Sequence, residues 1–147
     1  MIGDILKSLR KRAGASQSEI AAKMGVSRER VKNLEASNNA VLSVLKDYLD
    51  ACGTRLSFGI FDNAGNYAAT LGLESIKESL SELRKKRSLT QAGLSCAMGL
   101  SRSRVEQIEN GTENIKLDTL YKYIKGCGLE LRLAIKPLTS GNASPPL

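Results

Sequence analysis

The side chains that most often perform chemistry in proteins are scarce in this chain. It contains no histidine, so the commonest general acid–base residue and metal ligand is missing. The three cysteines, Cys52, Cys96 and Cys127, lie far apart without a C-x-x-C pair, which argues against zinc and fits a reducing compartment. No nucleophile–histidine pair and no glycine-rich phosphate loop can be assembled. The sequence therefore predicts no enzyme, no metal and no cofactor.

What remains is charge and hydrogen-bonding chemistry. The 22 lysines and arginines exceed the 15 acidic residues, which gives a net charge of +7 and a pI near 9.5. A basic excess of this size suits a polyanionic partner. With no tryptophan, two phenylalanines and four tyrosines, platforms for stacking single-stranded bases are scarce. Many of the polar side chains occur in two similar segments, VSRERVKNLE at 26–35 and LSRSRVEQIE at 100–109.

These two segments are parts of a longer internal repeat. A shift of 74 residues aligns 2–35 with 76–109 and gives 13 identical pairs in 34 positions. After a one-residue insertion the match resumes, for example at Leu45/Leu120, Tyr48/Tyr123 and Cys52/Cys127. Self-similarity of this extent indicates two copies of one structural unit.

Each copy has the plan of a helix-turn-helix. An amphipathic first helix ends in a basic cluster, which suits a helix C-terminus. A short second helix begins at Ser16 or Thr90 and ends at a Met-Gly pair, where glycine permits a tight left-handed turn. Ser27 or Ser101 then caps a third helix, and the combination is typical of a helix-turn-helix. The positions expected to face inward are Ile20, Ala21, Val26, Val31 and Leu34, and in the second copy Leu94, Ser95, Leu100, Val105 and Ile108.

A fourth helix and a strand complete each copy. Residues 41–52 and 117–127 predict the fourth helices, and the alternation of apolar residues over 54–60 and 129–135 predicts one strand per copy. Because a lone strand leaves its backbone unpaired, we expect these two strands to pair. The predicted fold is mostly α, with two tandem lambda-repressor-like helix-turn-helix domains and a small antiparallel sheet. The predicted organisation is a first unit at 1–61, a linker at 62–72, a second unit at 73–136 and a disordered tail at 137–147.

The segments SQSEIAAKMGVSRERVKNLE at 16–35 and TQAGLSCAMGLSRSRVEQIE at 90–109 resemble the lambda-repressor/Cro-like, or XRE, helix-turn-helix family. The glutamine after the cap, the turn glycine and the glutamate that closes the third helix stand where that family has them. The final strand of each copy is similar to that of HipB-type antitoxin repressors, in which such a strand joins two subunits. Two departures are that both units share one polypeptide, and that Arg30 and Arg104 replace residues that are more often small or hydroxylated.

This resemblance implies double-stranded DNA as the partner, with the third helix in the major groove. Arg28 and Arg102 suit guanine O6 and N7, and Glu106 could accept a hydrogen bond from cytosine N4, which Lys32 could not. The side chains expected to face bases are Arg28, Glu29, Lys32 and Asn33, and in the second copy Arg102, Ser103, Glu106 and Gln107. The expected phosphate contacts are Ser16, Gln17, Ser27 and Arg30, and in the second copy Thr90, Gln91, Ser101 and Arg104.

Together these features predict a transcriptional regulator of bacterial or phage type, cytoplasmic and nucleoid-associated. One chain would act as a pseudo-dimer that reads an imperfect palindrome, with half-sites roughly 34 Å apart. The alternative is an antitoxin or antiactivator whose main partner is a protein, either a toxin or an activator. Strand pairing between chains would instead give a homodimer. No segment approaches the roughly 18 apolar residues of a membrane span, and no signal peptide is expected.

Overall fold

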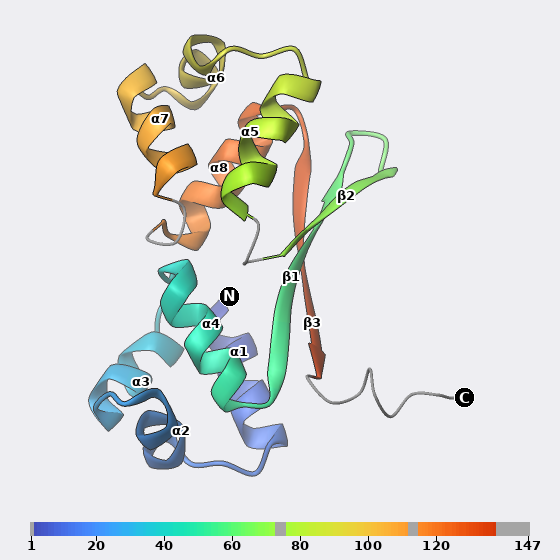
Figure 1. Cartoon of the computed structure of the whole chain (residues 1–147). Coiled ribbons are helices and arrows are strands. Elements are labelled where there is room, and N and C mark those ends of the chain that lie inside the picture. Colours follow the sequence, from blue (N-terminus) through green and yellow to red (C-terminus); the bar gives the residue numbers. More distant parts are fainter. Residues whose placement is uncertain (1, 73–75, 112–114, 138–147) are drawn as a thin grey trace. The chain divides into compact units, whose positions relative to one another are not determined.

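The computed structural model describes residues 2–72, 76–111 and 115–137, which form eight helices and three strands (Figure 1). These residues divide into an N-terminal unit, 2–56 with 135–137, and a C-terminal unit, 57–134. The helices of the N-terminal unit are α1 (Ile2–Arg12), α2 (Gln17–Met24), α3 (Arg28–Glu35) and α4 (Leu42–Ala51). Those of the C-terminal unit are α5 (Ile76–Lys86), α6 (Gln91–Met98), α7 (Arg102–Asn110) and α8 (Leu117–Gly126). The predicted four helices per copy are therefore confirmed.

The second helix of each helix-turn-helix, α2 or α6, begins with a side-chain cap. The Ser16 hydroxyl accepts a hydrogen bond from the Glu19 backbone N–H at 3.0 Å, and the Glu19 carboxylate accepts one from the Ser16 N–H at 2.9 Å. This reciprocal capping box satisfies two amides that the helix leaves unpaired. At α6 only the Thr90 hydroxyl caps, accepting from the Gly93 N–H at 2.9 Å, because Gly93 has no carboxylate.

The turn between the two helices of each motif is made by glycine and serine. Gly25 and Gly99 adopt φ values of 71° and 69°, a left-handed conformation that costs glycine no steric strain. Ser27 and Ser101 then cap α3 and α7, each accepting a hydrogen bond at 3.2 Å from the backbone N–H three residues later. The helix-turn-helix predicted from the sequence is thus built twice.

Each unit has its own core, in which the predicted inward positions are mostly confirmed. Ile20 and Val31, like Leu94, Val105 and Ile108 in the second copy, are fully buried. Tyr48 and Tyr123 join these cores from the fourth helices.

Three expected core positions are less buried than predicted: Leu100, Val26 and Leu34. Leu100 is 38 % exposed, because it lies in the turn between α6 and α7 and not on either helix. Its counterpart Val26 occupies the same turn and is only half-buried, and Leu34 is half-buried as well. Val26 and Leu100 lie in so short a turn that only part of each side chain can pack against the two helices, whereas Leu34 lies within α3.

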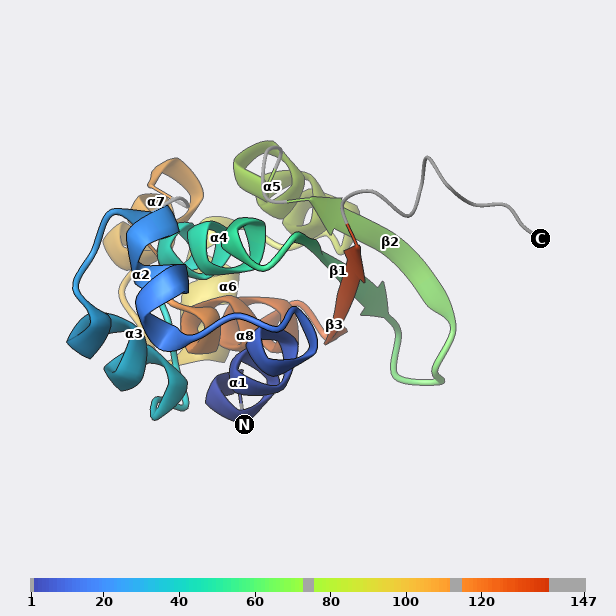
Figure 2. The same ribbon diagram turned by 90° about the horizontal axis from the view of Figure 1, so that it is seen from below.

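The three strands are β1 (Thr54–Phe61), β2 (Tyr67–Gly72) and β3 (Glu130–Pro137), and β1 lies between the other two (Figure 2). β1 and β2 are antiparallel, with a register that runs from Ser57 opposite Gly72 to Phe61 opposite Tyr67. The two strands that follow the repeated helices, β1 and β3, are neighbours within one chain. The predicted pairing of these strands is therefore confirmed.

β2 lies inside the segment 62–72 that the sequence predicts to be a linker. The Asp62 carboxylate accepts hydrogen bonds from the backbone N–H groups of Ala64 and Asn66, both at 2.9 Å, and closes a tight turn. This turn folds residues 67–72 back along β1. This strand could not be predicted from the sequence, because Leu71 is its only fully buried side chain. Its residues therefore show no alternation of apolar and polar side chains.

The compact units divide at residue 57, inside β1, whereas the predicted units are 1–61 and 73–136. β1 pairs with β2 and lies next to β3, and the predicted unit bounds stay a prediction. Of the predicted tail at 137–147, residues 138–147 lie outside the described residues.

One face of the sheet is apolar and buried. Phe58, Ile60, Leu71 and Leu131 lie on it, and α5 packs against β2. On the opposite face, a Cβ atom added at Gly59 would lie 2.9 Å from Cε1 of Phe61. The Phe61 ring thus covers this glycine, next to the β-bulge at Ile60 and Phe61.

A tight approach of α1 to the end of α3 gives the first testable prediction. A Cβ atom on Gly3 would lie only 2.2 Å from the Glu35 carbonyl oxygen, so Gly3→Ala must push the two helices apart. We expect the free energy of unfolding, measured by urea denaturation, to fall by about 1–3 kcal/mol or more. Lys7→Ala, on the exposed side of α1, is the control and should change it by less than about 0.5 kcal/mol. Equal stability of Gly3→Ala and the wild type would contradict this packing.

Candidate nucleic-acid interface

The outward surfaces of α3 and α7 carry the residues that the sequence places against bases. All eight are exposed, while Val31 and Val105 on the opposite sides of the same helices are fully buried. Within the described part of the chain, none of these eight side chains forms a hydrogen bond or an ion pair. Their donors and acceptors are therefore free to meet a ligand. The eight are Arg28, Glu29, Lys32, Asn33, Arg102, Ser103, Glu106 and Gln107.

The hydroxyl groups expected to meet phosphates are the helix caps. Ser16, Ser27, Thr90 and Ser101 each use the hydroxyl oxygen to accept a hydrogen bond from a backbone N–H. A hydroxyl also has one hydrogen to donate, so capping leaves it able to bind a phosphate oxygen. Arg30 and Arg104, the two cationic members of the expected set, are exposed.

The two glutamines of the expected phosphate set are partly used inside the protein. Nε2 of Gln17 donates to Glu35 Oε1 at 3.1 Å, and Nε2 of Gln91 donates to Glu109 Oε1 at 3.2 Å. A side-chain amide has two N–H groups, so each glutamine keeps one donor. Both residues are half-buried, which leaves part of the amide at the surface.

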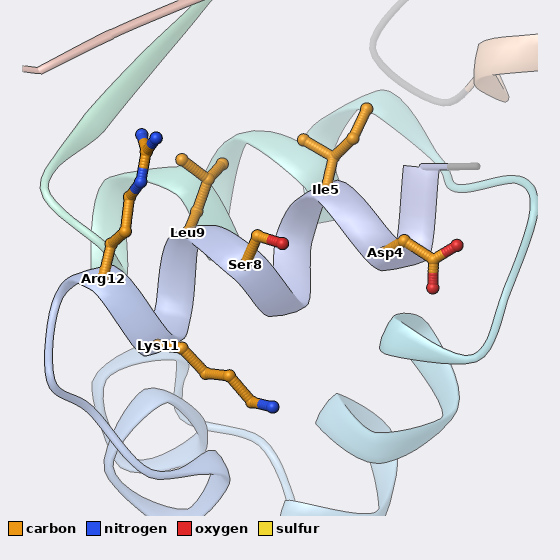
Figure 3. A pocket seen from close by; sticks show the side chains of 6 residues that line it. All are labelled: Asp4, Ile5, Ser8, Leu9, Lys11 and Arg12. Carbon is orange, nitrogen blue, oxygen red and sulfur yellow. The ribbon is translucent and has the colours of Figure 1, made fainter.

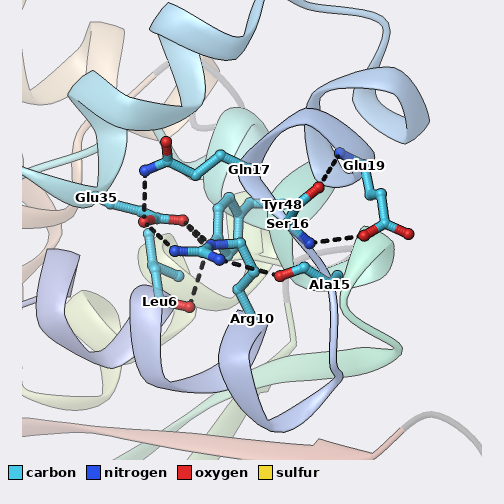
Figure 4. A network of polar contacts seen from close by, with 8 residues as sticks. All are labelled: Leu6, Arg10, Ala15, Ser16, Gln17, Glu19, Glu35 and Tyr48. Atoms are coloured by element: carbon cyan, nitrogen blue, oxygen red, sulfur yellow. Dashed lines mark hydrogen bonds and ion pairs between the residues drawn. The ribbon is translucent and has the colours of Figure 1, made fainter.

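The glutamate that closes α3 is the centre of a buried polar network (Figure 4). The Arg10 guanidinium donates to both carboxylate oxygens of Glu35, from Nε at 2.7 Å and from Nη2 at 3.1 Å. The Tyr48 hydroxyl lies 2.6 Å from Glu35 Oε2 and 2.9 Å from the Leu6 carbonyl oxygen, and its single proton serves one of them at a time. With Gln17 included, the network joins α1, α2, α3 and α4.

The second copy repeats this network nearly atom for atom. Arg84 donates to Glu109 at 2.7 and 3.1 Å, and the Tyr123 hydroxyl lies 2.7 Å from the same carboxylate. The sequence did not by itself identify this network. It did contain a signal for it, because the four network positions are identical in the two copies: Arg10/Arg84, Gln17/Gln91, Glu35/Glu109 and Tyr48/Tyr123.

The electrostatics of the network favour a charged glutamate. Burial acts to raise the pKa of Glu35, but hydrogen bonds from Arg10, Tyr48 and Gln17 outweigh burial and hold this pKa below its ordinary value. The pKa of Glu109 is lowered in the same way. Burial and the adjacent carboxylate raise the pKa of Tyr48 and of Tyr123, so both hydroxyls remain protonated donors.

The basic clusters at the ends of α1 and α5 divide into internal and exposed members. Arg10 and Arg84 are buried in the networks, so they are not available to phosphates. Lys11 and Arg12 are exposed and line a hollow of about 720 Å³ on α1 together with Asp4, Ile5, Ser8 and Leu9 (Figure 3). Lys11 and Arg12 point away from each other (Figure 3). A straight sugar-phosphate backbone would therefore contact one of them at a time.

The described residues hold little that suggests other chemistry. They contain no cluster of three or more potential metal ligands. Burial raises the pKa of Cys52 and of Cys127 to about 11, whereas Cys96 is exposed. None of the described helices is long and apolar enough to cross a membrane.

Removing the charge of Glu35 tests the network directly. Glu35→Gln leaves Arg10 buried without a counter-ion, which costs about 3–5 kcal/mol in comparable pairs, and Glu109→Gln should cost a similar amount. Urea denaturation at pH 7 measures both, with the exposed Glu29→Gln as the control. If Glu35→Gln and Glu29→Gln were equally stable, the ion pair would not hold the helices together.

The lowered pKa of Glu35 and Glu109 also predicts acid sensitivity. A carboxylate with a depressed pKa stabilises the fold above its ordinary pKa of 4.5 and loses that contribution as the pH falls through the folded-state value. Thermal unfolding from pH 6 to pH 3 should show a steep loss of stability in the wild type. In the double variant Glu35→Gln/Glu109→Gln, the loss over the same range should be smaller. Parallel curves would count against the lowered pKa.

Comparison with known families gives two matches. A model described as "Helix-turn-helix" matches residues 80–133, and one described as "Helix-turn-helix domain" matches residues 2–56. No curated protein and no solved structure matches the chain significantly. The two matched segments each span one copy of the repeat. The chain therefore belongs to the helix-turn-helix family of DNA-binding proteins, as a tandem of two XRE-type domains.

Proposed function

We propose that this DNA-binding regulator recognises a specific double-stranded sequence, with one polypeptide supplying both reading helices of a pseudo-dimer. The observation that carries the proposal is that α3 and α7 each present four exposed polar side chains that have no hydrogen-bond or ion-pair partner among the described residues. Behind them, a buried network fixes each helix to the rest of its unit. Rigid support and free hydrogen-bonding groups are what base recognition requires.

Arg28 and Arg102 are proposed as the main base-reading residues. Each is the first residue of its recognition helix, the end that meets base edges in this motif. A guanidinium can donate two parallel hydrogen bonds to guanine O6 and N7, a contact worth about 1–3 kcal/mol of discrimination. Asn33 and Gln107, which follow about one and a half turns later, carry amides that can pair with adenine.

The phosphate contacts are proposed to set the register on the duplex. The cap hydroxyls and the free N–H groups of Gln17 and Gln91 can donate to phosphate oxygens, and Arg30 and Arg104 add charge. These contacts carry no sequence information, but they make binding strongly dependent on salt. The full proposed set is Ser16, Gln17, Ser27, Arg30, Thr90, Gln91, Ser101 and Arg104.

The two half-sites are proposed to be unlike and centred roughly 34 Å apart, about one helical turn. A homodimer must read two identical half-sites, since its two recognition helices are the same. Here the outward residues differ at 29/103, 32/106 and 33/107. The neighbouring positions of β1 and β3 within one chain support a pseudo-dimer that needs no second subunit. A protein partner such as a toxin or an activator stays a prediction.

Selection of bound duplexes from a random pool tests this function. Arg28→Ala should relax one half of the recovered consensus and Arg102→Ala the other half. On the wild-type consensus, each should weaken binding about 5- to 150-fold. Arg132→Ala removes the same charge from the exposed side of the sheet and serves as the control. If Arg28→Ala and Arg102→Ala weakened binding to every sequence equally, these arginines would not read bases.

A further inference from the structure

We infer that the chain binds its DNA site in one orientation only, and that the pair Lys32 and Glu106 sets this orientation. The inference rests on the proposed function. A homodimer on a palindrome has two equivalent orientations, because exchanging its subunits changes nothing. A single chain with unlike reading helices has two different orientations, and their energies differ wherever the two helices demand different bases.

The charge reversal at 32/106 distinguishes this position from the rest of the outward surface. Lys32 is cationic and Glu106 anionic, both are exposed, and neither has an internal partner among the described residues. The other outward pairs conserve charge or replace a charge by a neutral group: Arg28/Arg102, Glu29/Ser103, Arg30/Arg104 and Asn33/Gln107.

The spacing places this pair next to the arginines that read guanine. Lys32 follows Arg28 by four residues and Glu106 follows Arg102 by four, so each pair shares one face of its helix. Four residues rise about 6 Å along a helix, which is close to two base pairs at 3.4 Å each. Arg102 and Glu106 form no ion pair with each other in the described structure, so both remain available to bases. Each helix therefore reads a second position about two base pairs from its guanine.

The two side chains demand opposite groups at that second position. The Lys32 ammonium can only donate, so it favours guanine O6 and N7. The Glu106 carboxylate can only accept, so it favours the amino group of cytosine and opposes guanine O6 and N7. Glu106 also lines a hollow of about 510 Å³ beside α7 with Ser103, Gln107 and Asn110. An amino group that enters this hollow meets an acceptor in polar surroundings.

In the reversed orientation, Lys32 and Glu106 both face a base group that they cannot pair with. Lys32 then meets an amino group, and Glu106 meets the acceptors of guanine. Each mismatch costs about 5- to 150-fold in affinity. The two positions lie on different helices in different units, so the costs should multiply to at least about 25-fold.

An exposed cysteine provides an attachment site for a label that reports the orientation of the chain on DNA. Cys96 on α6 is exposed, whereas Cys52 is half-buried and Cys127 is buried, and burial raises the pKa of both to about 11. A thiol-directed iron chelate that cleaves DNA will therefore attach at Cys96 near neutral pH. The matched variant Ala22→Cys/Cys96→Ala moves the label to the repeat-equivalent, exposed position on α2. The duplex is the one recovered by pool selection with the wild type.

We expect the label at Cys96 to cut one half of the duplex and the label at residue 22 to cut the other half. In the labelled Lys32→Glu/Glu106→Lys variant, the pattern should reverse on the same duplex, since only exposed residues have changed. Equal cutting of both halves from either label, a symmetric selected sequence, or a pattern that the exchange leaves unreversed would each overturn the inference while leaving DNA binding intact. Failure of the wild type to bind any duplex would instead overturn the proposed function.

Discussion

The whole architecture depends on one buried ion pair, made twice. Arg10 and Glu35 bring α1 and α3 together across 25 residues of sequence, and Arg84 and Glu109 do the same for α5 and α7. Taking two charges out of water is costly, and the cost is offset only when the remaining hydrogen-bonding positions are filled. Tyrosine and glutamine fill them here, and no buried side-chain polar atom in the described residues lacks a partner.

The need to keep this network paired explains why the two copies differ in their outward residues but not in their network residues. Glu35 and Glu109 lie on the buried sides of α3 and α7 and the other network residues lie on the neighbouring helices, and changing one of them would leave a buried charge or hydrogen bond unpaired. Among the residues that the structure describes, the eight outward side chains form no hydrogen bond or ion pair, so their substitution costs the fold little. A duplicated unit can therefore keep its internal network while its outward surface changes, as Lys32 and Glu106 illustrate.

Most of the helical fold could be predicted from the sequence, because caps, turn glycines and apolar periodicity are local signals. β2 could not, since its pairing depends on a turn at Asp62 and its residues show no alternation. The exposure of the predicted site residues followed from helical geometry once the inward positions were known. The network was missed because its members lie far apart in sequence, and polar residues conserved between repeats resemble surface residues until the fold shows them buried. Gln17 and Gln91 illustrate the difference, since each contributes to the frame while keeping one donor for a ligand.

The central claim is that two similar helix-turn-helix units, each held by the same buried network, present different surfaces to one double helix. The most direct measurement compares the affinity of the wild-type chain for its selected duplex with its affinity for two symmetric derivatives. In each derivative, one half-site is replaced by an inverted copy of the other. The account predicts that the asymmetric duplex binds more tightly than both derivatives at the same salt concentration. A symmetric derivative that binds as tightly as the selected duplex would contradict it.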